Sequence, residues 1–186
     1  MVTLRAAEAT DAEFLTALWA EALRRCDHAD QVADVETVIK AANASPEQRL
    51  VVAEYDAKPA GAVLLRVSTV SPLNLEPAVQ VLSPHVAPDF RRHGVGRVLM
   101  ESAVAFAEEL GILNIATAVG TGSRESNRFM ARLALGPHAT MRLAPTAAVR
   151  ARITAQRPTL AASGNGRHLT RVLAARRSMR RSEAAG

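Results

Sequence analysis

The sequence predicts a mixed α/β fold, and three observations support this prediction. Strand-like and helix-like segments follow one another in the order β-α-α-β-β-β-α-β-α-β. Two of the strand-like segments, 49–56 and 61–68, are joined by turn residues and form a predicted hairpin, so the sheet is expected to be mainly antiparallel. A chain of 186 residues that is 48% apolar is long enough to bury a core beneath its helices.

The N-terminal part is predicted to contain one strand and two helices. Residues 2–8 have the composition of a short strand. A helix is predicted at 10–25, because Thr10 and Glu13 have the spacing of a capping box. Its expected apolar face consists of Phe14, Leu15, Leu18, Trp19 and Ala22, and we interpret Trp19 as a core residue rather than a platform for a ligand. A second, weaker helix is predicted at 34–43.

The second half of the chain alternates strands with helices. Residues 78–88 form a predicted central strand that Pro84 interrupts, and 95–111 form a long amphipathic helix that Gly111 closes. Residues 112–120 are nearly all apolar, as expected for a strand buried on both faces. The remaining predicted elements are a helix at 123–135, a short strand at 139–145 and a short helix at 146–155.

The net charge of +5 is located at the C-terminal end of the chain. Residues 160–186 contain six arginines and one acidic residue, Glu183, so that 6 − 1 = +5 and the preceding residues sum to about zero. We therefore expect a main domain at 1–158 and a basic tail at 159–186, with a linker and an amphipathic helix in the tail. We do not expect nucleic acid as a partner, except through this tail, because the main domain has no excess of positive charge.

Cysteine content and hydropathy exclude several other classes of protein. Cys26 is the only cysteine, so an intrachain disulfide and a cysteine-based zinc site are both excluded. The opening "MVTLRAAEATDAEF" lacks the apolar centre of a signal peptide, and no apolar run approaches membrane-spanning length. We expect a cytoplasmic protein without a metal site, and we leave open whether it forms a homodimer.

The stretch "RRHGVGRVLM", residues 91–100, combines two glycines with basic side chains where a strand is followed by a helix. Glycines let a backbone approach a ligand closely, and a helix N-terminus offers unpaired N–H groups and partial positive charge. The combination predicts a phosphate site. A nucleotide-binding P-loop is excluded, since Arg97 stands where that loop has lysine, and a dinucleotide fingerprint is excluded, since its third glycine would be Leu99.

The stretch "HVAPDFRRHGVGRVLMESAVAFAEELG" resembles the coenzyme-A-binding motif of the GNAT superfamily of N-acyltransferases. Arg91, Gly94 and Gly96 match its Arg-x-x-Gly-x-Gly pattern, and the order of elements over residues 3–145 is also that of the family. The resemblance implies a mainly antiparallel central sheet splayed between its fourth and fifth strands, acetyl-CoA as acyl donor and an amine as acceptor. The coenzyme-binding residues that it implies are Val86, Arg91, Arg92, His93, Gly94, Val95, Gly96, Arg97 and Asn127.

Some of these residues have an equally simple structural interpretation. Arg92 and Arg97 are candidates for the phosphates near the pyrophosphate, and each could instead be a solvated surface charge. Asn127 could hold the pantetheine arm of the coenzyme or could stabilise the start of its own helix.

The sequence departs from the family at three positions that usually serve catalysis. Pro84 stands where the resemblance implies a backbone N–H for the oxyanion, and proline has no N–H. The donor would then come from His85 or Val86 through a shifted bulge, or be lost. Gln80 stands where some members have a glutamate base. The late helix offers Arg132 or Ala134, depending on the alignment, where the family often has a tyrosine acid.

His85 is therefore our candidate base, because imidazole exchanges protons near neutral pH, although it could equally be a structural residue at a strand end. Glu54 and Tyr55 are further titratable residues on a strand, one on each face. Two functions remain open from the sequence. The first is an N-acyltransferase, and the second is a coenzyme-A-binding regulatory or interaction protein with weak catalysis.

Overall fold

A computed structural model of the chain describes residues 1–118, 123–139 and 141–156. These residues fall into two parts, Met1–Gly136 and the residues from Pro137 on, and each part is described by itself. The predicted basic tail, 159–186, lies outside the described residues. The domain boundary at 158 therefore stays a prediction.

The first part is built on a sheet with the strand order β1-β2-β3-β4-β5. Neighbours are antiparallel from β1 to β4, whereas β4 and β5 are parallel. The strands are β1 (Val2–Ala6), β2 (Gln48–Tyr55), β3 (Lys58–Thr69), β4 (Pro77–Val86) and β5 (Asn114–Thr117). The predicted mixed, mainly antiparallel sheet and its hairpin are thereby confirmed.

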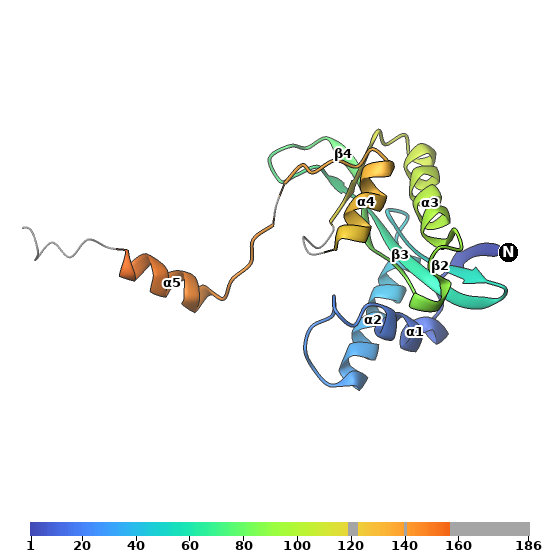
Figure 1. Cartoon of the computed structure of the whole chain (residues 1–186), viewed down its shortest axis with the longest axis horizontal. Helices are drawn as coiled ribbons and strands as arrows, with labels where there is room; N and C mark the ends of the chain where they lie inside the picture. The colour runs from blue at the N-terminus through green and yellow to red at the C-terminus, as the bar shows by residue number, and fades with distance from the viewer. Residues whose placement is uncertain (119–122, 140, 157–186) are drawn as a thin grey trace, which may run out of the picture. The chain divides into compact units, whose positions relative to one another are not determined.

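Helices cover both faces of this sheet (Figure 1). Apolar side chains of α1 and α2 pack on one face, and those of α3 and α4 pack on the other. The helices are α1 (Ala12–Leu18), α2 (His28–Ala44), α3 (Val95–Glu109) and α4 (Arg124–Arg132), with 3-10 turns η1 (Ala9–Asp11) and η2 (Pro88–Phe90) before α1 and α3. This three-layer arrangement buries the sheet between two separate apolar clusters.

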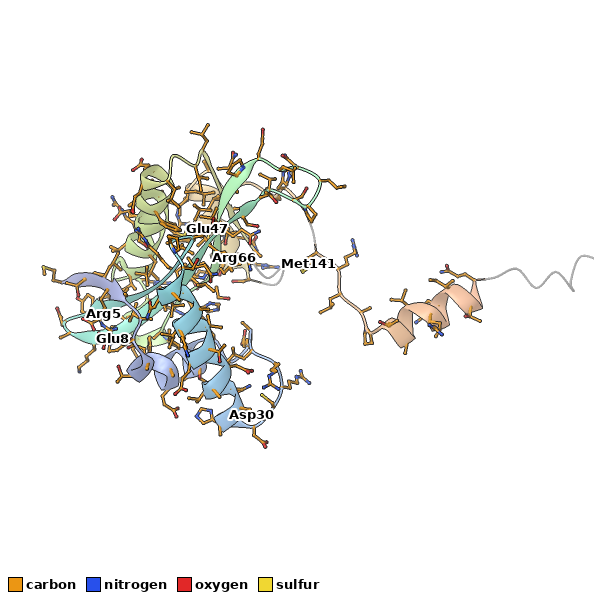
Figure 2. All side chains as sticks on the ribbon, turned by 180° about the vertical axis from the view of Figure 1, so that it is seen from behind. Arg5, Glu8, Asp30, Glu47, Arg66 and Met141 are labelled. Carbon is orange, nitrogen blue, oxygen red and sulfur yellow. The ribbon has the colours of Figure 1, made fainter. Side chains whose placement is uncertain are left out.

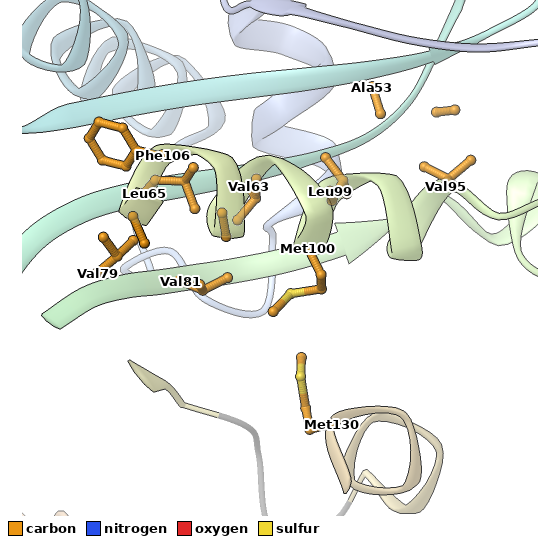
Figure 3. Close-up of a cluster of buried hydrophobic side chains, with 13 residues drawn as sticks. Ala53, Val63, Leu65, Val79, Val81, Val95, Leu99, Met100, Phe106 and Met130 are labelled. Carbon is orange, nitrogen blue, oxygen red and sulfur yellow. The ribbon is translucent and has the colours of Figure 1, made fainter. Parts of the chain in front are cut away.

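The larger cluster holds α3 against the sheet (Figure 3). Val95, Leu99 and Phe106 lie along one side of α3 and are fully or almost fully buried. They meet Val63, Leu65, Val79 and Val81 from β3 and β4, and Met130 of α4 closes the cluster. Burying each large aliphatic or aromatic side chain contributes about 1.5–3 kcal/mol, so this face fixes the position of the N-terminus of α3.

The first two helices differ from their predicted lengths. The helix predicted at 10–25 is a 3-10 turn followed by α1, and it ends at Leu18, because Trp19 leaves the helical conformation with φ −106° and ψ 17°. The predicted capping pair was also wrong, since Asp11 accepts the Glu8 N–H. Trp19 is a core residue, 6% exposed, as predicted, whereas Ala22 is exposed.

The second helix is longer than the predicted 34–43. It begins after Asp27, whose extended backbone stands at the N-cap. Only Val35, Ile39 and Ala42 are buried along its length, so its first turns carry too few apolar residues to be detected from periodicity.

In the last third, one predicted strand is present but shorter and less buried than predicted, and another is absent from the described residues. Ile115, Ala116 and Thr117 of β5 are half-buried rather than buried on both faces, and the strand ends before Ala118. Residues 139 and 141–145 form no strand. A strand requires a partner for its hydrogen bonds, and the part from Pro137 on offers none among its described residues. The helix predicted at 146–155 is present as α5 (Thr146–Ala155).

An ion-pair cluster joins the first strand to the turn before α1. Arg5 donates two hydrogen bonds to Asp11, at 2.6 and 2.7 Å, and one to Glu54, at 2.6 Å. Asp11 is 4% exposed, and its hydrogen bonds from the Arg5 guanidinium hold the pKa of this carboxyl below the usual value. Glu54 is thus a structural partner of Arg5.

Candidate active site

A β-bulge interrupts β4 at the position where the sequence contains proline. His85 stands opposite Ala62 and Leu82 opposite Leu64, so two residues, Ser83 and Pro84, face a single residue of β3. Ser83 has φ 46°, in the left-handed region that costs an L-residue about 1–2 kcal/mol. Bulges of this kind redirect backbone groups and concentrate beside active sites.

The neighbouring strand leaves β4 just before this bulge. Among the described residues, the parallel pairing of β4 with β5 ends at Val81 and Thr117, and the rest of β4 is paired with β3 alone. The predicted splay between the fourth and fifth strands is present here. Pro84, which cannot donate a hydrogen bond, therefore interrupts no pairing with β5.

The backbone N–H of Val86 faces the side from which β5 has departed. The N–H of Ala87 donates to the Ala60 carbonyl of β3 at 2.8 Å. Successive residues of a strand direct their N–H groups to opposite sides, so the N–H of Val86 points away from β3 and that of His85 points toward it. Of the two substitute donors that the sequence suggested, Val86 is the one directed to the splay.

Trp19 links α1 to the bulge. Its indole Nε1–H donates a hydrogen bond of 2.9 Å to the carbonyl oxygen of Ser83. This contact satisfies a backbone oxygen that the left-handed conformation of Ser83 turns out of the strand. The sequence placed Trp19 in the core but offered no sign of this second role, because its partner lies 64 residues further along the chain.

The glycine-rich loop between β4 and α3 has the backbone that the sequence led us to expect. Gly94 is the N-cap of α3 with φ 83°, and Arg92 before it is also left-handed, with φ 65°. No atom lies within 4 Å of the position that a Gly94 Cβ would occupy, so the loop is open on that side. The first N–H groups of α3 therefore stand at an exposed turn with positive partial charge.

Aromatic contacts support the loop from beneath. The ring of Tyr55 lies edge-on to His93 at 5.0 Å and 5.9 Å from Phe90, between ring centroids. His93 Nδ1 is 2.8 Å from the carbonyl oxygen of Arg91. His93 is thus held from two sides, and Tyr55, one of the further titratable residues, lies under the glycine-rich loop.

The basic side chains of the loop differ in their partners. Arg97 forms an exposed ion pair with Glu101 of the next turn at 2.7 Å. Arg91 and Arg92 are exposed and have no ion pair with any described carboxylate. The two arginines before the glycines are accordingly the ones available to an incoming anion.

Of the glycines where α3 meets the sheet, Gly61 is the one whose lack of a side chain lets the helix approach. A Cβ on Gly96 would lie 3.6 Å from Val86 Cγ2, an ordinary contact distance, so the first turn of α3 lies on the end of β4 without requiring glycine there. A Cβ on Gly61 would lie 2.7 Å from the His85 carbonyl oxygen and 3.1 Å from Val95 Cγ1. Gly61 is a positioning residue that the sequence reasoning missed, although a glycine inside a strand signals close approach.

The remaining predicted residues lie apart from the loop. His85 is exposed and, standing opposite Ala62, points to the face on which α1 and α2 pack. Gln80, three residues before the bulge, accepts a 2.8 Å hydrogen bond from Arg66. Asn127 donates to the Ser123 carbonyl at 2.7 Å in the first turn of α4, which agrees with the helix-start interpretation and leaves a coenzyme contact a prediction.

Two searches of the described residues found nothing further. No helix among them is long and apolar enough to cross a membrane. No group of three or more His, Cys, Asp or Glu residues within the described ranges is arranged to hold a metal ion.

Comparison with known proteins identifies the family. The sequence matches the family model described as "Acetyltransferase (GNAT) family" over residues 13–135, well over half of the chain. The splayed sheet and the glycine loop lie within or directly beside this range. The chain belongs to the GNAT acetyltransferase family.

Solved structures agree with this fold. A transcriptional regulator from Bacillus halodurans is 17% identical with a TM-score of 0.67, and 78% of this chain covers 100% of that one. Glucosamine-6-phosphate N-acetyltransferase from Arabidopsis thaliana is 12% identical (TM-score 0.62; 78% and 99% covered). A predicted acetyltransferase with acetyl-CoA from Clostridium acetobutylicum is also 12% identical (TM-score 0.61; 78% and 96% covered). The sequence has no significant match among curated proteins.

Proposed function

We propose that the chain is an N-acetyltransferase that moves an acetyl group from acetyl-CoA to a primary amine of a small molecule or a protein. The observation that supports this most directly is the open left-handed turn at Gly94, followed at once by the N-terminus of α3. Such a turn presents several N–H groups to a pyrophosphate. Arg91 and Arg92 add positive charge that no described carboxylate neutralises.

The acetyl group would be transferred directly between the two bound substrates. The amine nitrogen attacks the thioester carbonyl, a C–N bond forms, the C–S bond breaks, and coenzyme A leaves as the thiolate or thiol. The Val86 N–H, which points to the splay, is our candidate for holding the coenzyme or the oxyanion there. His85 is our candidate for accepting the proton that the amine loses, either directly or through water.

Three departures in the sequence favour a second function. Pro84 occupies the bulge without an N–H to offer, Gln80 cannot accept a proton, and the described part of α4 contains no tyrosine. A protein that binds coenzyme A for regulation or interaction would tolerate these losses. The retained loop favours the enzyme, because coenzyme binding without turnover is the rarer use of such a site.

Two measurements on the same preparation separate the alternatives. Acetyl-CoA binding is measured by calorimetry, and turnover is measured as release of free coenzyme A thiol with a broad panel of amines. Binding with amine-dependent turnover supports the enzyme, whereas binding without turnover on any amine supports the regulatory protein. Absence of binding would refute both.

The variant Gly94→Val tests the site itself. A β-branched residue is strained at φ 83°, and its side chain would stand where the phosphate approaches, so acetyl-CoA binding should be lost. The strain is confined to an exposed turn, so the unfolding transition should stay cooperative. Unchanged affinity for acetyl-CoA would show that this loop is not the coenzyme site.

A further inference from the structure

One face of the central strands carries a single permanently charged side chain. On the side where α1 and α2 pack, β3 and β4 present Ala62, Leu64, Arg66, Ser68, Ala78, Gln80, Leu82 and His85. Arg66 is the only arginine, lysine or carboxylate among them. It is exposed, because the apolar cluster beneath α1 and α2 includes β2 and the Ala62 end of β3 but no residue of β4.

Arg66 has a neutral partner rather than a carboxylate. Its Nη2 donates to Gln80 Oε1 at 2.8 Å. Ion pairs with acids are formed by Arg5, Arg24, Arg49 and Arg97, whereas Arg66, like the remaining described arginines, forms none with a described carboxylate. Arg66 stands apart from the Arg5 cluster on the sheet (Figure 2). Its charge is therefore not neutralised by any described side chain.

The pair presents mainly hydrogen-bond donors to its surroundings. A guanidinium has five N–H donors and no acceptor, so the Gln80 amide must turn its oxygen to Arg66 and its NH2 group away. The remaining guanidinium N–H groups of the exposed Arg66 and this NH2 group are then the donors of the pair that a ligand could use. Such a set matches the two oxygens of a carboxylate, which accepts two parallel hydrogen bonds from arginine.

This donor set lies on the same face as the candidate base and near the bulge. Gln80 precedes Ser83 by three residues, which is about 10 Å of strand. His85 points to this face from the other side of the bulge. An acceptor whose amine reaches the splay could thus bind Arg66 and Gln80 with a second group. This second group would lie about 10 Å or less from the amine.

We infer that Arg66 and Gln80 bind a carboxylate of the acceptor, so that the amine substrate is an amino acid, a peptide end or a related amine that also carries a carboxylate. This inference rests on the proposed function, because the ligand is an acceptor only if the protein transfers an acetyl group. The binding of the carboxylate itself does not require turnover.

The experiment compares matched pairs of acceptors. A series of ω-amino carboxylic acids of increasing chain length is tested against the corresponding ω-amino carboxamides, with acetyl-CoA saturating. The acids should have the lower KM, with an optimum at one chain length. Arg66→Gln should raise the KM of the best acid about tenfold to a hundredfold and leave the amide unaffected. Arg66→Lys should recover part of the loss, because it keeps the charge but not the planar fork.

Arg49→Gln is the matched control, since it removes the same charge from β2 on the face that packs against α3. It should leave the preference for acids unchanged. If amines are acetylated with no preference for acids, or if Arg66→Gln keeps that preference, this inference fails while the proposed function stands.

If the protein acetylates no amine, the carboxylate site can still be tested by measuring binding directly. Binding of the ω-amino acids is followed by NMR titration of the parent protein and Arg66→Gln, with and without coenzyme A. Arg66-dependent binding of the acid over the amide supports the site even if no amine is acetylated. Equal binding of acid and amide, or equal binding to both proteins, would overturn it.

Discussion

The hydrogen bond from Trp19 to the bulge allows a quantitative test of how the fold shapes β4. Trp19→Phe keeps an aromatic ring in the core but removes the Nε1–H that reaches the Ser83 oxygen over 2.9 Å. Leaving this part-buried carbonyl without its donor costs at most about 1–3 kcal/mol, the range for a fully buried group. If the freed backbone leaves its left-handed conformation, about 1–2 kcal/mol of strain is recovered. With the middle of each range, about 2 less about 1.5 kcal/mol, the net loss of stability is about 0.5 kcal/mol, and its upper limit is about 2 kcal/mol.

A loss of about 0.5–2 kcal/mol lowers the melting temperature by roughly 1–8 °C in a domain of this length. The rate of acetyl transfer should fall by more than the loss of folded protein explains, because a relaxed bulge moves the Val86 N–H and His85 out of place. Ile39→Val is the matched control. It removes one methyl group from the same apolar cluster, lowers stability by about 0.5–1.5 kcal/mol and does not alter the bulge.

The assay is thermal unfolding together with kcat and the KM of acetyl-CoA for both variants. Trp19→Phe should lower kcat well below that of Ile39→Val, with the KM of acetyl-CoA changed little in either. An unchanged melting temperature would refute the energetic argument. Equal kcat in the two variants would show that Trp19 is only a core residue.

The other predictions concern the loop support, the base and the ion-pair cluster. Gly61→Ala should destabilise the protein by about 1–3 kcal/mol, because its Cβ would lie 2.7 Å from the His85 carbonyl oxygen. It should also weaken acetyl-CoA binding in calorimetry, and unaltered affinity would contradict the role of Gly61. His85→Ala should lower the rate at pH 7 and flatten its rise with pH at constant coenzyme affinity, and a parent-like pH profile would mean that His85 is structural. Because the pKa of Asp11 is lowered in the folded state from its usual 3.8, its pairing with Arg5 stabilises the fold above about pH 4 and is lost progressively as the pH falls below that value. Asp11→Asn should cost about 1–3 kcal/mol at neutral pH and reduce the acid dependence of unfolding, so identical acid titrations of parent and variant would refute the assignment.

The sequence alone was sufficient for the family, the sheet and the glycine turn before α3. These rest on local signals, because glycine spacing sets the backbone of the turn and hydrophobic periodicity marks the strands and helices. The hairpin at 49–68, the helix after Gly94 and the break at Pro84 were all predicted from neighbouring residues and are present.

Tertiary structure decided everything that depends on partners distant in the chain. Trp19 donates a hydrogen bond to Ser83, Arg5 to Glu54, and Arg66 to Gln80. No periodicity in the sequence connects any of these pairs. The end of α1 and the length of β5 were mispredicted for the same reason, since both depend on contacts made across the sheet. A hydrogen bond between distant residues leaves no pattern in either segment, so only the folded chain shows which polar groups it brings together.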